Sequence, residues 1–341
     1  MAAKTYYDKD AKLSLLKGKK IVVLGYGSQG HAQAMNLKDS GMTVTVCELK
    51  GSGSWKLALK DGWKAGKNLT DDLDAAIKTA DWVHFLLPDE VQGPVWKKNV
   101  KPNIKKGVVL SWSHGFNIRF KDLTGVVPPP ESDVVMIAPK GPGNLVRRTF
   151  QEGKGTPALV AVEQDYSGKA KALALAFCRG IGATRAGVIE TTFTEETETD
   201  LFGEQNVLCG GTVDLVKAGF ETLVAAGYQP EIAYFECLHE LKLITDLIQE
   251  GGMAWMNNSI SDTAEYGEYS RGPRIVNAAT REQMKKNLEE VRNGSFAAEY
   301  LSEKANGSPI MTAARKAMAE HPIEVVGERL RKMMPWLKKK E

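Results

Sequence analysis

The length, composition and charge of the chain exclude several classes of protein. Its 341 residues exceed what one hydrophobic core usually organises, so two domains are expected. The 45 basic and 42 acidic residues leave a net charge of +3 and are spread along the chain, apart from a lysine run at 338–340 that we interpret as a solvated tail. Nucleic-acid binding is not expected, because it requires a clustered basic surface.

The cysteines and the hydropathy indicate where the protein works. Cys47, Cys178, Cys209 and Cys237 are scattered among apolar residues without metal-ligand spacing, which favours buried, reduced thiols. Residues 1–20 are charged and lack the apolar segment of a signal peptide, and no apolar run is long enough to span a membrane. We therefore expect a cytoplasmic protein without membrane association.

In the first half of the chain, short apolar runs alternate with helical patterns. Residues 28–39 are predicted to form a helix between the first two runs. The predicted buried strands are residues 21–25, 44–48, 81–88, 107–114, 133–139 and 158–162. Such alternation is typical of a parallel, doubly wound α/β sheet, so we predict a Rossmann-like domain over residues 1–182.

After about Gly182 the pattern changes to long runs with apolar residues three and four apart. Pro230 fits a helix start, and Gly251 with Gly252 fits a helix end. We predict an all-helical domain over residues 183–329, followed by a basic tail over 330–341.

A glycine-rich turn follows the first predicted strand and opens the first predicted helix. In GYGSQG, Gly25 permits the tight turn, Gly27 lets the backbone approach a pyrophosphate, and Gly30 allows the helix to pack closely on the strand. The helix N-terminus then offers amide groups to the phosphates. A turn with only a structural role is the alternative, but the strands that follow favour dinucleotide binding.

The end of the second predicted strand bears on the choice of cofactor. Glu48 lies where an acid accepts hydrogen bonds from ribose hydroxyls and repels a 2′-phosphate, which favours NADH. Lys50, Ser52 and Ser54 could instead hold a phosphate, so use of NADPH stays open. The predicted cofactor-binding residues are Gly25, Tyr26, Gly27, Ser28, Gln29, Gly30, Glu48, Lys50, Ser52, Ser54 and Gly141.

Two acid pairs in the second half have the spacing of a metal site. Asp200 with Glu204, and Glu236 with Glu240, are four residues apart and could each aim two oxygen ligands at one point from a helix. Four carboxylates suit two Mg²⁺ ions, which could bind vicinal oxygens of a substrate. An exposed, salt-bridged face is the alternative interpretation.

The acids that precede the first pair, Glu195, Glu196 and Glu198, are interpreted as a solvated helix start that is favoured by the helix dipole.

Three further residues are candidates for chemistry. His114 follows a predicted strand, at the edge of the sheet where ligands bind, and could transfer a proton. Lys140 lies in a proline- and glycine-rich loop at another strand end and could point to the metal site, although a rigid turn explains that loop equally well. Ser261 could donate a hydrogen bond to a substrate, which is a weak signal by itself. His31 and His239 are expected to be packed.

Together these segments resemble the ketol-acid reductoisomerases of the short, bacterial and archaeal type. The resemblance covers nearly the whole chain and rests on several long motifs in one order: YYDKDA at 6–11, GYGSQGHAQA at 25–34, HGFNI at 114–118, APKGPG at 138–143, ETETDLFGEQ at 196–205, YFECLHELK at 234–242 and SISDTAEYG at 259–267.

The resemblance implies a Mg²⁺-dependent alkyl migration in 2-acetolactate or 2-aceto-2-hydroxybutyrate, and then hydride transfer that yields a 2,3-dihydroxy acid for branched-chain amino-acid synthesis. It implies that Asp200, Glu204, Glu236 and Glu240 ligate two ions with Asp200 between them, that Lys140 and His114 support proton chemistry, and that Ser261 binds substrate. A knotted helical domain is also implied. So is a homodimer, or a higher assembly, in which the second acid pair comes from the other subunit.

Two positions depart from the family pattern. Leu49 stands where arginine is usual in the ribose loop, which puts a preference for NADPH in doubt, and Asn144 stands where histidine is common. A metal-independent hydroxyacid dehydrogenase and a non-catalytic nucleotide sensor are the rival interpretations. Activity that survives removal of divalent ions would favour the dehydrogenase, and nucleotide binding that tolerates loss of the carboxylates would favour the sensor.

Overall fold

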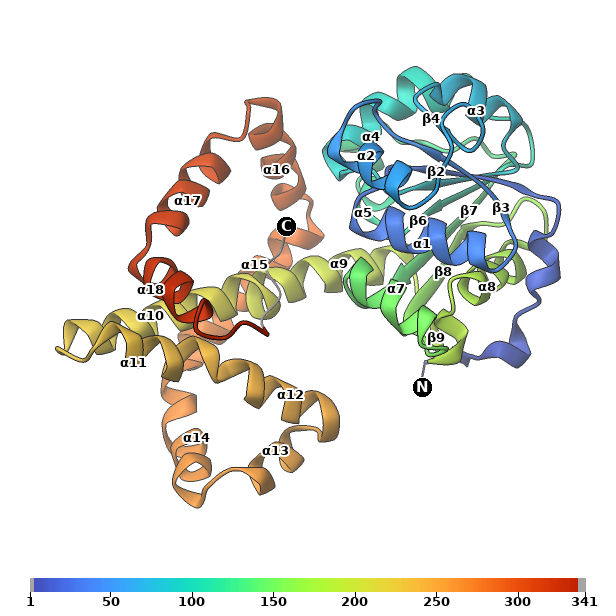
Figure 1. The fold of residues 1–341 in the computed structure, drawn as a ribbon. Helices are drawn as coiled ribbons and strands as arrows, with labels where there is room; N and C mark the ends of the chain where they lie inside the picture. The colour runs from blue at the N-terminus through green and yellow to red at the C-terminus, as the bar shows by residue number, and fades with distance from the viewer. Residues whose placement is uncertain (1–2, 337–341) are drawn as a thin grey trace. The chain divides into compact units, whose positions relative to one another are not determined.

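The computed structural model describes residues 3–336 and divides into two compact units after Thr199. The first unit is built on a mixed sheet, and the second contains only helices among its described residues. Both are drawn in Figure 1, coloured along the chain.

The sheet of the first unit has nine strands among the described residues, in the order β1-β9-β8-β7-β6-β5-β2-β3-β4. The strands are β1 (Thr5–Tyr6), β2 (Lys20–Leu24), β3 (Thr43–Cys47), β4 (Leu69–Thr70), β5 (Trp82–Phe85), β6 (Val109–Trp112), β7 (Asp133–Pro139), β8 (Ala158–Gln164) and β9 (Val188–Glu190). All six strands predicted from apolar runs are present, and the predicted helix is α1 (Ser28–Asp39).

The prediction of a wholly parallel sheet is wrong at two pairs of strands. The pairs from β4 through β7 and the pair β8–β9 are parallel, but β8 runs antiparallel to β7, and β1 runs antiparallel to β9. The connection between β7 and β8, which contains α7 (Gly143–Gln151), stays at one end of the sheet instead of crossing back to the end where β7 began. The chain therefore re-enters where β7 ended, and Ala158 pairs with Pro139.

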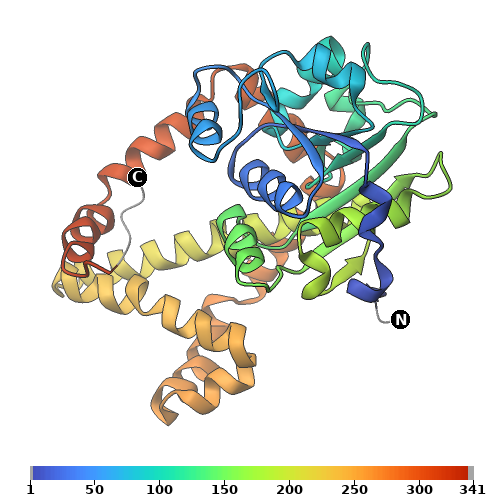
Figure 2. The same ribbon diagram turned by 45° about the vertical axis from the view of Figure 1, so that its right-hand side comes forward.

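Helices cover both faces of this sheet, and each face has its own hydrophobic core (Figures 1 and 2). Along β2, Ile21 and Val23 belong to one core, and Val22 and Leu24 belong to the other, because successive strand side chains point to opposite faces. The helices and helical turns of this unit are α1, α2 (Gly53–Lys60), α3 (Leu73–Thr79), α4 (Asp89–Val95), the π-helical turn Trp96–Val100, α5 (Phe116–Arg119), α6 (Lys121–Thr124), α7, α8 (Ala170–Gly180) and the 3-10 turns Asp8–Asp10, Leu13–Leu16 and Ala183–Arg185.

The change of pattern near Gly182 does not coincide with the division of the structure. Strand β9 follows it and pairs with β8, and the division falls inside α9 (Phe193–Gly203), after Thr199. A three-residue strand is too short to give a periodic signal, so the sequence change precedes the structural one.

The second unit consists of helices and two π-helical turns, and its helical character agrees with the prediction. Its compact core is formed by Phe220, Ala233, Tyr234, Ile323 and Leu330. The elements are Glu204–Leu208 (π), α10 (Gly210–Ala225), α11 (Pro230–Tyr234), Phe235–His239 (π), α12 (Leu241–Gly251), α13 (Met253–Ser259), α14 (Asp262–Ile275), α15 (Ala278–Arg292), α16 (Ser295–Ala305), α17 (Pro309–Glu320) and α18 (Pro322–Arg331).

Some expectations concern the chain as a whole. Among residues 3–336, no helix combines the length and the apolar character needed to cross a membrane. Cys47 and Cys178 are buried as expected, but Cys209 is exposed and Cys237 is half-buried. The predicted basic tail begins inside α18, and its lysine run at 338–340 lies outside the described residues.

Candidate functional site

The glycine turn has the geometry that the sequence predicted. Gly25 adopts φ +95°, and a Cβ on it would lie 2.8 Å from the carbonyl oxygen of Leu86. A Cβ on Gly30 would lie 2.2 Å from the carbonyl oxygen of Gly25, so helix and strand pack as closely as only glycine allows. A Cβ on Gly27 would have no neighbouring heavy atom within 4 Å. Helix α1 begins at Ser28 without a side-chain cap, which leaves its first amide groups able to meet an anion.

Tyr26 does not present its side chain to a cofactor. The ring is fully buried, and its hydroxyl donates to Asp61 at 3.0 Å and accepts from the indole of Trp63 at 2.8 Å. His31 packs beside this ring, with Nε2 3.4 Å from the same carboxylate of Asp61, as expected for a packed histidine. In this turn, therefore, only the backbone of Tyr26 is available to a cofactor.

The first turn of α1 is tied to the loop that follows β7. Gln29 Nε2 donates to the carbonyl oxygen of Gly141 at 2.8 Å, and the amide of Gly143 donates to Ser28 Oγ at 3.1 Å. A Cβ on Gly143 would lie 1.9 Å from the carbonyl oxygen of Ser28. The structure thus brings together three of the predicted cofactor-binding residues, Ser28, Gln29 and Gly141.

Glu48 organises the loop after β3. One carboxylate oxygen accepts from the amide of Tyr26 at 2.8 Å, and the other accepts from the amide of Leu49 at 2.9 Å and from Ser52 Oγ at 3.3 Å. Ser52 Oγ also caps α2 by accepting from the amide of Trp55 at 2.9 Å. Of the other predicted phosphate ligands, Lys50 is exposed and Ser54 is half-buried.

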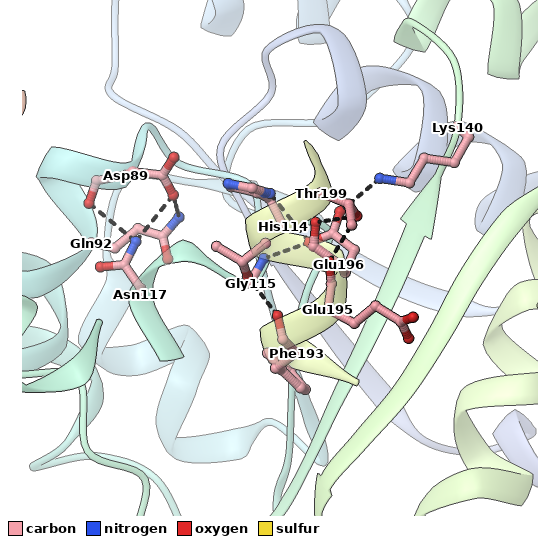
Figure 3. Close-up of polar contacts among 11 residues, drawn as sticks. Asp89, Gln92, His114, Gly115, Asn117, Lys140, Phe193, Glu195, Glu196 and Thr199 are labelled. Atoms are coloured by element: carbon pink, nitrogen blue, oxygen red, sulfur yellow. Dashed lines mark hydrogen bonds and ion pairs between the residues drawn. The ribbon is translucent and has the colours of Figure 1, made fainter. Parts of the chain in front are cut away.

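A buried carboxylate, Glu196, forms the centre of the polar site at the carboxyl edge of the sheet (Figure 3). Its side chain is 1% exposed. Lys140 Nζ lies 2.7 Å from one carboxylate oxygen, and His114 Nδ1 lies 3.3 Å from the other, which also accepts from the amide of Gly115 at 3.1 Å. The interpretation of Glu196 as a solvated residue at a helix start is therefore wrong.

The surroundings of Glu196 decide its ionisation. Burial opposes ionisation, but the contacts with His114 and Lys140 outweigh it and hold the pKa of Glu196 below its usual value. Glu196 is thus a carboxylate that links the two residues predicted for proton chemistry. Its position four residues before Asp200, on the same helical face, is the signal that could have identified it.

Close contacts fix the start of α9 against the segment that carries His114. A Cβ on Gly115 would lie 2.2 Å from Thr197 Oγ1 and 3.0 Å from the carbonyl oxygen of Phe193, so only glycine fits there. Arg119 Nη2 pairs with Glu198 at 2.9 Å. These contacts hold the first turns of α9, and with them Glu196, beside His114.

One turn further along α9, Asp200 completes a group that could hold a cation. His114, Glu196 and Asp200 offer three ligand atoms that lie within 4.8 Å of one another. Two carboxylates at this spacing fit a hard divalent ion such as Mg²⁺. Glu204 follows on the same helical run and is exposed.

The second predicted acid pair is not brought into this group within one chain. Glu236 and Glu240 are both exposed. Apolar residues near both pairs are themselves exposed, among them Leu208 at 70% and Leu243 at 55%. Ser261 is exposed and caps α14 by accepting from the amide of Ala264 at 3.3 Å.

A second carboxyl group that the sequence patterns did not indicate, that of Asp89, lies at the start of α4. It accepts from Asn117 Nδ2 at 3.1 Å and from Gln92 Nε2 at 3.4 Å, and these three residues form a separate group in Figure 3. Burial raises the pKa of Asp89 to about 6, against the opposing influence of His114 and Asn117. Its place just after β5, at the edge where parallel strands bind ligands, is the signal that could have found it.

The remaining departure from the family pattern has a local role. Asn144 is exposed, and its side-chain oxygen accepts from the amide of Leu145 at 2.9 Å.

A doubly wound sheet with a glycine turn, and acidic and basic groups gathered at its carboxyl edge, defines a dinucleotide-binding oxidoreductase. Comparison with known domains narrows this class. Residues 15–187 match the acetohydroxy acid isomeroreductase, NADPH-binding domain, and residues 193–336 match the ketol-acid reductoisomerase, C-terminal domain. The chain belongs to the ketol-acid reductoisomerase family, as the sequence motifs indicated.

Solved structures support this assignment at two levels. An NADH-preferring ketol-acid reductoisomerase from an uncultured archean is 46% identical, with a TM-score of 0.91, and the match covers 99% of this chain and 100% of that chain. A putative oxidoreductase from Jannaschia sp. CCS1 is 18% identical, with a TM-score of 0.58 over 80% of this chain and 97% of that chain, and shows the fold alone.

Proposed function

We propose that this protein converts 2-acetolactate or 2-aceto-2-hydroxybutyrate into the corresponding 2,3-dihydroxy acid, by Mg²⁺-dependent alkyl migration and reduction with NAD(P)H. The proposal includes a cytoplasmic role in branched-chain amino-acid synthesis, without a nucleic-acid or membrane partner. The observation that carries it is the group of Lys140, His114, Glu196 and Asp200 at the edge of a dinucleotide-binding sheet.

The chain's own residues would divide the work as follows. Asp200 and Glu204 would hold divalent cation, together with Glu236 and Glu240, and a cation bound there would supply Lewis-acid polarisation of the substrate's oxygens. Lys140 and His114, both in contact with Glu196, would donate and accept protons as charge moves between those oxygens. Ser261 would donate a hydrogen bond to the substrate.

NADH is proposed as the preferred cofactor, with NADPH as the alternative. Glu48 places a carboxylate beside the glycine turn, and Ser52 is already used to cap α2 and to bond Glu48, which leaves Lys50 and Ser54 as the remaining phosphate ligands of the predicted set. A carboxylate in this place disfavours the 2′-phosphate of NADPH. The 46% identical relative is described as NADH-preferring, which agrees with this reading.

The active form is proposed to be a homodimer or a higher assembly with shared sites and a knotted helical domain. In one chain Glu236 and Glu240 are exposed, and so are many apolar side chains of the helical unit. Exposed apolar faces of this kind mark interaction surfaces. A second copy could cover these faces and bring its acid pair to Asp200 and Glu204.

Steady-state oxidation of NADH and of NADPH with 2-acetolactate and Mg²⁺, before and after treatment with EDTA, tests the proposal. The expected result is turnover that EDTA abolishes and Mg²⁺ restores, with the higher kcat/KM for NADH. Turnover that persists in EDTA would point to a metal-independent hydroxyacid dehydrogenase instead. Higher kcat/KM with NADPH would leave the reaction standing and overturn only the assignment of Glu48.

A further inference from the structure

A continuous network of hydrogen bonds runs from the buried core of the sheet unit to the half-buried cofactor turn. His84 on β5, Ser111 on β6 and Gln33 on α1 are all completely buried. His84 Nδ1 lies 2.6 Å from Ser111 Oγ, and His84 Nε2 lies 3.0 Å from Gln33 Oε1. The ring centroids of His84 and Phe177 are 4.8 Å apart, so the imidazole also packs against an apolar side chain.

Elementary donor and acceptor rules fix the direction of the hydrogen bonds in this network. The indole of Trp82 can only donate, and it donates to Ser111 Oγ at 2.6 Å. Gln33 Oε1 can only accept, so His84 must carry its proton on Nε2. Burial lowers the pKa of His84 to about 3, which keeps the ring neutral, and Nδ1 then accepts from the hydroxyl of Ser111.

At Gln33 the hydrogen-bond network branches toward two parts of the site. Gln33 Nε2 donates to Gln29 Oε1 at 3.1 Å and to Ser113 Oγ at 2.9 Å. Gln29 Nε2 then donates to the carbonyl oxygen of Gly141 at 2.8 Å. One branch therefore reaches the first turn of α1 and the residue after Lys140, and the other reaches the residue before His114.

We propose that Gln33, oriented by His84, is a positioning residue that holds Gln29 in the orientation the cofactor requires and holds Ser113 so that His114 meets its partners. An amide at this position can accept from His84 and donate to both branches at once. Because a buried network with all partners satisfied is rigid, it fixes three strand-end segments in one arrangement. This inference rests on the cofactor site proposed above.

The chain offers a matched control on the same helix. Asn36 is also completely buried in α1, and its amide bonds to the carbonyl oxygens of Val146 and Ile181 and to Arg147. These partners lie outside the branches to Gln29 and Ser113. Gln33→Met and Asn36→Leu each replace a buried amide by an apolar side chain of similar shape, so both measure the general cost of losing one.

The experiment titrates NADH into each full-length variant and follows nucleotide fluorescence at equilibrium, with kcat for 2-acetolactate and Tm recorded alongside. We expect both variants to lower Tm, and only Gln33→Met to raise the Kd for NADH, by about tenfold, and to lower kcat. In a Gln29→Leu background, Gln33→Met should have little further effect on Kd, because the branch through Gln29 is already broken.

Equal changes of Kd in Gln33→Met and Asn36→Leu, or additive effects of Gln33→Met and Gln29→Leu, would overturn the proposal. If Gln33→Met does not fold, Ser111→Ala removes the hydroxyl that orients His84 and should raise Kd in the same direction by a smaller factor. An unchanged Kd in a folded Ser111→Ala protein would also count against it. Wild-type protein that binds NADH but does not turn over 2-acetolactate would refute the proposed reaction. The comparison of Kd values for NADH would still test the positioning role of Gln33, because it does not depend on turnover.

Discussion

The two units bury their apolar residues to very different extents. The sheet unit has two extensive cores, one on each face, with Trp82, Trp96 and Trp112 fully buried. The helical unit has a small core around Phe220 and exposes large apolar side chains, including Leu208, Met253, Trp255, Tyr266, Ile275 and Ile310. A sheet covered on both faces buries its apolar side chains within one chain, whereas these helices leave apolar faces exposed, as interaction surfaces do.

The polar groups follow the same division. In the sheet unit Glu196 is buried and held by three partners, whereas Glu236 and Glu240 in the helical unit are exposed. The difference teaches that the group around Glu196 is assembled by the sheet unit itself, whereas the acids proposed to bind cation in the helical unit stay exposed to solvent in one chain.

The largest effect is expected from Glu196→Gln, which removes the charge that links Lys140 and His114. We expect kcat with 2-acetolactate to fall about a thousandfold, because two positioned proton-transfer groups lose their common partner. Tm should also fall, because the charged contacts that lower the pKa of Glu196 stabilise the folded state. Glu195→Gln, at an exposed neighbour bonded to Thr191, is the control, and equal losses in both variants would refute the central place of Glu196.

The same substitution should have opposite signs in the two units. Gly115→Ala should destabilise the protein by about 2 kcal/mol or more, because the new Cβ would lie 2.2 Å from Thr197 Oγ1. Gly267→Ala, inside α14 with open space around it, should stabilise by up to about 1 kcal/mol, because alanine favours a helix. Urea unfolding of both variants measures this, and a stable Gly115→Ala protein would show that α9 is not tightly held.

The exposed faces of the helical unit should matter for assembly, and an exposed leucine of the sheet unit should not. Wild-type protein should have a light-scattering mass at least twice the 37.3 kDa of one chain. Leu208→Arg should weaken association about tenfold or more, because a charge would have to be buried with the apolar face. Leu123→Arg, at a leucine that is 49% exposed in the sheet unit, should leave the mass unchanged. A monomeric wild type would remove the argument for shared sites.

The smallest effect is a pH dependence of stability that arises in the sheet unit. The folded pKa of His84 is about 3 because of burial, whereas an unfolded histidine titrates near about 6.5. Stability from neutral His84 is therefore present above about pH 6.5 and is lost as pH falls toward the folded pKa, by about 1.4 kcal/mol per pH unit. Urea unfolding between pH 7 and 5 should show a shallower loss in His84→Gln than in wild type, and equal slopes would contradict a buried neutral ring.

Local sequence patterns determined the elements of this protein. The apolar runs located six of the nine described strands, the helix over Ser28–Asp39 was found to the residue, and Gly25 and Gly30 have the tight turn and the close packing that their spacing predicted. The long motifs identified the family. Each of these signals is contained in a few neighbouring residues, because period, turn chemistry and motif order are properties of the chain itself.

The tertiary structure alone decided which side chains meet and which strands reverse. Lys140 and Glu196 are 56 residues apart. The local pattern places Glu196 on the same helical face as Asp200, but it does not show that the carboxylate is buried against Lys140 and His114. The ring of Tyr26 is buried in the core, and Glu48 accepts hydrogen bonds within its own loop. Strand β8 is antiparallel to β7 because the connection between them stays at one end of the sheet. These outcomes depend on packing between distant segments, which the periodicity of a sequence does not encode.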